Sequence, residues 1–91
     1  MVREDIERMA DEGLVPAELL FADGFDDCII GLHAQTFDHE SCVVYDRNKI
    51  IEMLLSDGLG YEEAEEHFSF NIEGAYVGKH TPIYVITEVP L

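Results

Sequence analysis

The chain has 91 residues, 47% of them hydrophobic, and it carries 20 Asp and Glu against five Lys and Arg, for a formal net charge of −15. This length allows one small domain, and this hydrophobic content argues against a disordered chain. The negative charge excludes nucleic acid and anionic membranes as partners, because contact with phosphate requires clustered Lys and Arg.

The first thirteen residues predict an amphipathic helix. Ile6, Met9 and Ala10 recur at helical spacing within residues 3–12, and charged side chains fill most other positions. The same stretch lacks the apolar segment of a secretory signal, and nowhere does the sequence approach the roughly 18 consecutive apolar residues of a membrane span. The expected location is therefore cytoplasmic, and no membrane partner is expected.

A second, shorter helix is predicted over residues 17–22. Pro16 suits the first turn of a helix, and Gly24 suits the left-handed residue that ends one. Two strands are then predicted, over residues 27–35 and 41–46, from apolar runs bounded by polar residues. In the first strand, alternation predicts a common face for Cys28, Ile30 and Leu32.

Two consecutive helices are predicted next, over residues 47–55 and 61–75. Asp46 can accept hydrogen bonds from free amide groups at the start of the first helix, and the following Asp57-Gly58 pair ends it. The buried stripe of the first helix is expected to consist of Ile50, Ile51, Leu54 and Leu55. The stripe of the second helix is expected to consist of Tyr61, Ala64, Phe68, Ile72 and Ala75.

A last strand is predicted over residues 81–88, and Pro82 places it at a strand start or a sheet edge because proline has no N–H for the ladder. The predicted fold class is α+β: a small single domain over residues 1–91, in which a helix within residues 1–13 precedes an α+β core of residues 14–91. About three strands form the sheet, and two consecutive helices connect the second strand to the third. Parallel and antiparallel pairing of these two strands both stay open, as does the strand order.

Residues 71–85, NIEGAYVGKHTPIYV, have a superficial likeness to a phosphate-binding loop. That loop requires G-x-x-x-x-G-K-[ST] between a strand and a helix. Here only three residues separate Gly74 from Gly78, and His80 follows Lys79 where the loop needs a hydroxyl for magnesium. The order of the predicted elements is also reversed, with the helix first. The segment is therefore interpreted as a connector.

The chain's histidines and cysteines lack the spacing of a metal or catalytic site. His33, His39 and Cys42 lie close in sequence, but their spacing, H-x5-H-x2-C, matches no zinc-ligand framework. Cys42, like Cys28, lies in an apolar run, where a free thiol packs as a small hydrophobic side chain. No metal, cofactor or catalytic residue is therefore predicted, and the chain is interpreted as a non-enzymatic protein.

Several patches between residues 22 and 85 follow one pattern. They are A-D-G-F-[DE]-D-x-[FI]-I-G at residues 22–31, Tyr45-Asp46 opening a helix, Y-E-E-A at residues 61–64, and F-N-x-x-G-A-[YW]-x-G-x-x-T-P-[IL] at residues 70–83. In these patches the chain resembles a family of small, uncharacterised bacteriophage-encoded proteins. It departs from that family at Gly60, where members often have a serine helix cap.

The resemblance implies a phage accessory protein that acts in the cytosol of the host cell. Together with the charge, it points to a protein that binds and inhibits a basic host protein, such as a nucleic-acid-handling defence factor or a CRISPR effector, by imitating the charge of DNA. The candidate partner-binding residues form two groups of acids: Glu62, Glu63, Glu65 and Glu66, and Asp26, Asp27, Asp38 and Glu40.

Other interpretations stay open. The acids can serve only to solvate the surface, or they can adapt the protein to high salt. In a different class of function, the chain is a self-associating structural or regulatory module that forms a homodimer through an exposed strand edge. That edge would be residues 82–87, assisted by the apolar tail of residues 89–91.

Overall fold

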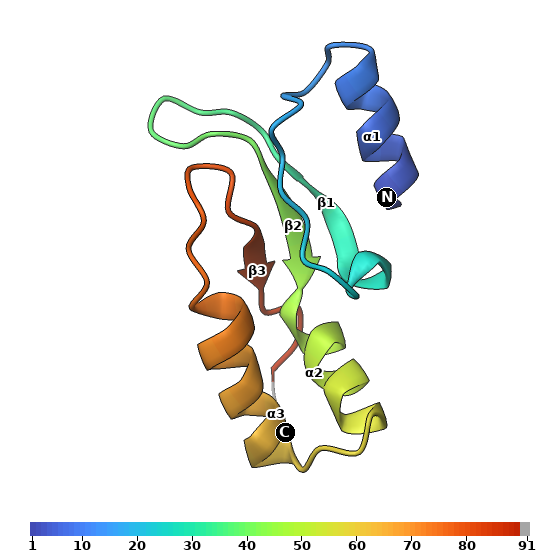
Figure 1. Cartoon of the computed structure of the whole chain (residues 1–91), viewed down its shortest axis with the longest axis vertical. Coiled ribbons are helices and arrows are strands. Elements are labelled where there is room, and N and C mark those ends of the chain that lie inside the picture. The colour runs from blue at the N-terminus through green and yellow to red at the C-terminus, as the bar shows by residue number, and fades with distance from the viewer. Residues whose placement is uncertain (90–91) are drawn as a thin grey trace.

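A three-stranded mixed sheet occupies the middle of the molecule, with α1 at one end and the α2–α3 pair at the other (Figure 1). The computed structural model describes residues 1–89. In chain order its elements are α1 (Arg3–Asp11), the 3₁₀ helix η1 (Asp26–Cys28), β1 (Ile29–His33), β2 (Cys42–Asp46), α2 (Arg47–Ser56), α3 (Tyr61–His67), the π-helix η2 (Phe68–Glu73) and β3 (Ile83–Val85). The predicted α+β class is confirmed, including the N-terminal helix and the two consecutive helices between the second and third strands.

β2 is the central strand of the sheet, and its two neighbours run in opposite directions. β1 pairs with β2 antiparallel, whereas β3 pairs with β2 in parallel and sets Ile83 opposite Val44. The connection between the two parallel strands contains α2, α3 and η2. Of the two pairings that remained open, the structure therefore has the parallel one.

β1 contains an irregularity that changes which of its side chains are buried. Its register against β2 shifts between Ile29 and Gly31, so that Ile30 is an extra residue in the strand. Ile29 is 6% exposed, whereas Ile30 is 47% exposed. The predicted common face of Cys28, Ile30 and Leu32 is wrong, because the extra residue changes the alternation of side chains along the strand.

No helix forms over residues 17–22, and the prediction of a short helix there is wrong. A helix this short gains too little from its own hydrogen bonds to form without help from packing. Instead the Leu19 side chain is buried in the core, and the backbone N–H of Ala22 donates a hydrogen bond to the phenol oxygen of Tyr45. Gly24 adopts the predicted left-handed conformation, with φ of 87°, but it lies in a turn rather than after a helix.

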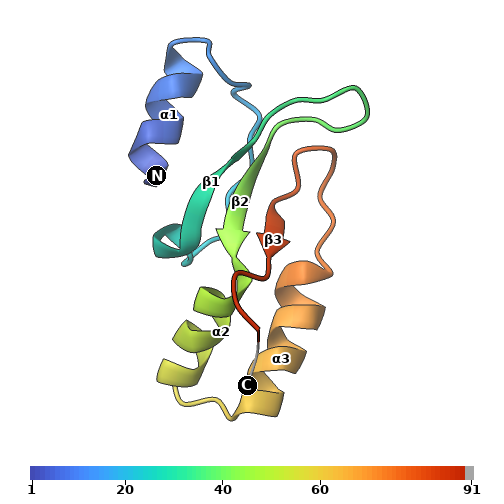
Figure 2. The same cartoon turned by 180° about the vertical axis from the view of Figure 1, so that it is seen from behind.

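α2 and α3 lie side by side beyond the ends of β2 and β3 (Figures 1 and 2). The Oδ1 atom of Asp46 accepts a 3.2 Å hydrogen bond from the backbone N–H of Lys49, which caps α2 as predicted. Gly58 follows this helix with φ of 100°, also as predicted. The expected helix over residues 61–75 is α-helical in α3 and continues as the π-helix η2, which ends before Gly74.

The hydrophobic core brings together residues from the sheet and from all three α-helices. Its largest fully buried side chains are Tyr45, Phe68, Ile6, Ile50, Val43, Cys28 and Cys42. Both cysteines are free thiols, and burial raises the pKa of each, which fits a structural role. Three residues of the predicted α2 stripe are buried, but Leu55 is 37% exposed.

β3 is shorter than the strand predicted over residues 81–88. After Val85 the backbone leaves the sheet, and the N–H of Thr87 donates to the side chain of Asn48 in α2 instead of to a neighbouring strand. Residues 90–91 of the predicted apolar tail lie outside the described residues. Within residues 1–89, none of the helices has the length and apolar character that crossing a membrane requires.

Candidate partner-binding surface

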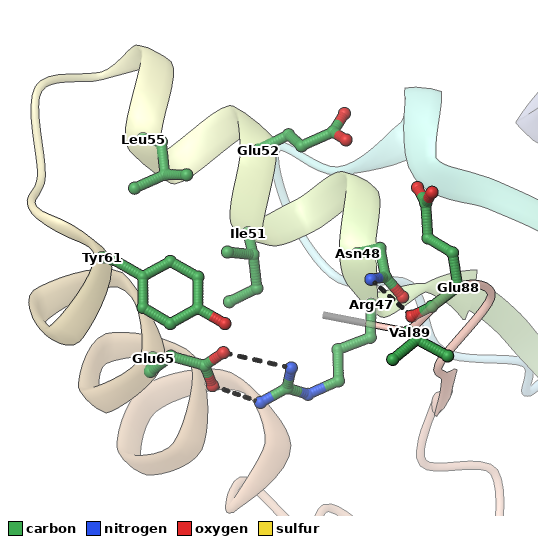
Figure 3. A pocket seen from close by; sticks show the side chains of 9 residues that line it. All are labelled: Arg47, Asn48, Ile51, Glu52, Leu55, Tyr61, Glu65, Glu88 and Val89. Carbon is green, nitrogen blue, oxygen red and sulfur yellow. Dashed lines mark hydrogen bonds and ion pairs between the residues drawn. The ribbon is translucent and has the colours of Figure 1, made fainter. Parts of the chain in front are cut away.

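A groove of about 370 Å³ lies between α2, α3 and the segment that follows β3 (Figure 3). The residues that line it are Arg47, Asn48, Ile51, Glu52, Leu55, Tyr61, Glu65, Glu88 and Val89. Its floor is apolar, because the facing stripes of α2 and α3 do not cover each other completely. Leu55 is 37% exposed and Tyr61 is 49% exposed, although both belong to stripes that the sequence predicts to be buried.

Arg47 is the one cation among these lining residues, and Glu65 neutralises it. The Nη2 and Nη1 atoms of Arg47 lie 2.5 and 3.5 Å from the two carboxylate oxygens of Glu65, and its Nε atom lies 3.9 Å from Glu73. The guanidinium also lies over the Phe68 ring, 4.7 Å from its centroid. The hydrogen bond from Arg47 lowers the pKa of Glu65, and the same bond raises the pKa of Arg47, so both groups stay charged at neutral pH.

Asn48 holds in place the third wall of the groove, which is the segment that follows β3. Its Oδ1 atom accepts a 2.9 Å hydrogen bond from the backbone N–H of Thr87, and its Nδ2 atom donates a 3.1 Å bond to the carbonyl oxygen of Glu88. The Thr87 hydroxyl also donates a 2.7 Å hydrogen bond to Asp46, the residue that caps α2. Because these bonds join the segment after β3 to the start of α2, the groove is preformed.

Helical geometry divides the four predicted acids of α3 between two faces. Glu65 turns toward the groove, where it binds Arg47 (Figure 3). The other three acids are exposed and lie away from the buried Ala64, on what we call the outer face of α3: Glu62, Glu63 and Glu66. The four predicted acids therefore do not lie on one face of the helix.

On this outer face, Glu63 is already engaged with the helix itself. Its carboxylate accepts a 3.4 Å hydrogen bond from the backbone N–H of Gly60, so that it supports the helix start where a serine cap is missing. Among residues 1–89, the side chains of Glu62 and Glu66 have neither an ion pair nor a hydrogen-bond partner. Phe70, which lines a shallow pocket together with Glu63 and Glu66, is 80% exposed. The outer face therefore offers carboxylates next to an exposed aromatic ring.

The second predicted group of acids lies elsewhere on the molecule. Asp26 and Asp27 belong to η1, and Asp26 lies 3.4 Å from an arginine of α1. Asp38 and Glu40 belong to the loop between β1 and β2, where Glu40 lies 3.7 Å from the amine of Lys79. The eight candidate acids thus occupy three separate parts of the structure, as the positions of α3, η1 and this loop show in Figure 1.

The three candidate metal ligands lie close together without forming a site. The ring centroids of His33 and His39 are 4.7 Å apart. Cys42, in contrast, is fully buried, and its thiol donates to the carbonyl oxygens of Glu40 and Lys79, each at 3.5 Å. Across residues 1–89, no three His, Cys, Asp or Glu side chains are placed to hold a metal ion together.

Sequence reasoning missed the groove, and with it Asn48, Glu52 and Glu88. An asparagine in the first turn of a helix is a weak signal for a hydrogen bond to another segment. It does not indicate which segment of the chain provides the partner. The partners of Asn48 lie 39 and 40 positions later in the chain. Glu52 and Glu88 likewise come to one groove only through the parallel pairing of β2 with β3.

Comparison with protein-family models, with curated proteins and with solved structures gives no match for this chain. No activity or partner is therefore transferred to this chain from a known protein.

Proposed function

We propose that this chain is a non-enzymatic binding protein that docks on a basic protein through the outer face of α3. The distribution of charge carries the proposal. The acids with a cation within 4.0 Å among residues 1–89 are Asp5, Glu7, Asp26, Glu40, Glu65 and Glu73. These six leave fourteen of the twenty acids without such a cation there, so the surface keeps a strong negative field that attracts basic proteins.

The partner that we propose is a nucleic-acid-handling host protein, and its inhibition is the proposed outcome. Such a protein exposes clustered Lys and Arg that normally meet phosphates. Glu62, Glu66 and Phe70 follow one another at four-residue spacing along α3 and η2. Their carboxylates and the aromatic ring can therefore contact the same basic surface of the partner. The resemblance of residues 22–85 to bacteriophage proteins supports a defence factor in the host cytosol as the partner.

Capture from a nuclease-treated bacterial lysate tests the proposal, with the salt concentration at about 0.1 M and at about 0.5 M. We expect a basic nucleic-acid-binding protein at the lower salt only, because screening weakens exposed ion pairs. The combined variant Glu62→Lys and Glu66→Lys should lose about tenfold or more of this capture.

The matched control is Glu12→Lys with Glu18→Lys, which changes the net charge equally at two exposed acids outside α3. This variant should retain most of the capture. Equal losses in the two double variants would contradict the role of the outer face. Recovery of the bait alone at the lower salt would contradict the proposal as a whole.

A second candidate function is self-association, and the exposure of residues just after β3 favours it. β3 is an edge strand, and beyond it Ile86 is 64% exposed and Val89 is 89% exposed. A strand edge that is followed by exposed apolar side chains can pair with a second copy. Light scattering at tens of micromolar protein measures the mass in solution. A strictly monomeric protein would remove this candidate.

A further inference from the structure

We propose that the groove between α2 and α3 binds a short segment of the basic partner, in which a large apolar side chain is flanked by Lys or Arg. This inference depends on the proposed function, because it names the part of the partner that the groove receives. The outer face of α3 then attracts the partner by charge, and the groove next to it provides the apolar contact.

The floor of the groove determines the size of the apolar part. Ile51 and Leu55 lie four residues apart on one face of α2, and Tyr61 begins α3 beside them (Figure 3). Four residues of α-helix span about 6 Å, so the floor accommodates one or two large side chains rather than a long helix. Leu55 and Tyr61 keep 37% and 49% of their surface in solvent, and covering that surface favours binding.

The rim of the groove determines the charge of the segment. Glu52 and Glu88 are exposed and border the groove together with Glu65 (Figure 3). Arg47, the one cation there, is already paired with Glu65, so the two other carboxylates are left to meet positive charge. A Lys or Arg beside the apolar side chain of the occupant can reach these carboxylates.

The same acids make other occupants unfavourable. A second copy of this chain that docks groove to groove would bring Glu52 and Glu88 near their own counterparts, and like charges repel. A nucleic acid would meet carboxylates where it needs cations. Because Asn48 already holds the third wall in place, the occupant need not order that segment on binding, which reduces the entropic cost.

A titration of the ¹⁵N-labelled protein with two blocked hexapeptides, followed by NMR, tests the inference. One peptide is Lys-Lys-Leu-Leu-Lys-Lys, and the other is Lys-Lys-Gln-Gln-Lys-Lys, which has the same charge without the apolar pair. We expect the leucine peptide to shift amide signals of the groove residues and to bind about fivefold or more tightly than the glutamine peptide, because only leucine covers the floor.

Two pairs of variants locate this binding. Leu55→Gln alters the floor, and Leu20→Gln is its control, since Leu55 is 37% exposed and Leu20, outside the groove, is 36% exposed. Glu52→Lys alters the rim, and Glu18→Lys is its control at another exposed acid. Each groove variant should weaken binding of the leucine peptide about threefold or more, and each control should change it less than twofold.

Equal affinity for the two peptides, or equal effects of the groove variants and their controls, would overturn this inference. The absence of any shift with the leucine peptide would overturn it as well. The proposal of a basic partner would survive these results, because it fails on a different measurement: capture that the Glu62 and Glu66 substitutions leave unchanged.

Discussion

The backbone N–H of Ala22 donates a 2.7 Å hydrogen bond to the phenol oxygen of Tyr45, and this bond joins the irregular segment after α1 to the central strand of the sheet. Tyr45 is fully buried, and its ring centroid lies 5.6 Å from that of Tyr84 in β3. The Tyr45 side chain of β2 therefore links the segment before η1 with β3, the strand that pairs with β2 in parallel.

We expect Tyr45→Phe to lower the free energy of unfolding by about 1–2 kcal/mol, because the N–H of Ala22 then loses its partner in a partly buried position. Urea unfolding measures the change. Tyr84→Phe is the control, since burial and neighbouring charges, but no hydrogen bond, act on the Tyr84 phenol among the described residues. A loss in the control as large as in Tyr45→Phe would contradict the assignment of the effect to this hydrogen bond.

Stability should fall at alkaline pH. Burial, followed by the proximity of Tyr45 and Glu73, raises the pKa of Tyr84 from 10.0 to about 12. As the pH rises, the Tyr84 phenol of the unfolded chain therefore loses its proton before that of the folded chain does. The contribution of the protonated Tyr84 phenol to the free energy of unfolding is thus fully present below about pH 10, and it is lost as the pH rises toward about 12. Urea unfolding at several pH values in this range should show the decrease. Tyr84→Phe should reduce it, whereas Tyr76→Phe, at a tyrosine that is 78% exposed, should not.

Glu65→Gln should lower the free energy of unfolding by about 1 kcal/mol at neutral pH, because it removes the carboxylate that Arg47 binds through two nitrogens. Because Arg47 lowers the pKa of Glu65, the contribution of the pair is present above the unfolded carboxyl pKa and is lost as the pH falls through the folded-state pKa. The difference between the protein and this variant should therefore disappear in acid.

Glu66→Gln is the control for that experiment, because Glu66 is exposed on the outer face of α3. It should change the free energy of unfolding by no more than a few tenths of a kcal/mol. If the effect of Glu65→Gln is undiminished in acid, the ion pair is not its cause.

Gly74→Ala should destabilise the end of η2. A Cβ atom at this position would stand 2.8 Å from the carbonyl oxygen of Ser69, which already accepts the N–H of Gly74 at 3.0 Å. The backbone must shift to relieve this contact, and we expect a loss of about 1–3 kcal/mol. Gly31→Ala is the control, because a Cβ there meets nothing within 4 Å. Thermal unfolding distinguishes the two variants, and an unchanged Tm for Gly74→Ala would contradict the expected strain.

The sequence predicts best those features that neighbouring residues determine. Asp46 and Gly58 mark the two ends of α2, because a cap and a left-handed glycine each act within one turn of the helix. The order of helices and strands follows from the same kind of local signal, which is why the α+β class is confirmed. Local signals do not tell where the three parts of the chain with candidate acids, α3, η1 and the loop between β1 and β2, lie relative to one another. Those positions depend on how the strands of the sheet pair.

Contact between residues distant in sequence explains three of the failures: the missing helix over residues 17–22, the early end of β3 and the overlooked groove. Over residues 17–22, burial of Leu19 and the bond to Tyr45 prevail over a weak helical tendency. β3 ends early where Asn48 binds the backbone 39 positions further on. The groove depends on the same bond, so no local pattern could indicate it.

The parallel pairing of β2 with β3 also has a kinetic consequence. These strands can meet only after the long connection through α2, α3 and η2 has closed, and chain entropy is lost before the first hydrogen bond of the ladder is gained. We therefore expect β3 to dock late in folding, and the third wall of the groove, formed by Glu88 and Val89, to form with it. A partner bound in the groove would hold this late-formed part in place and slow the unfolding of the chain.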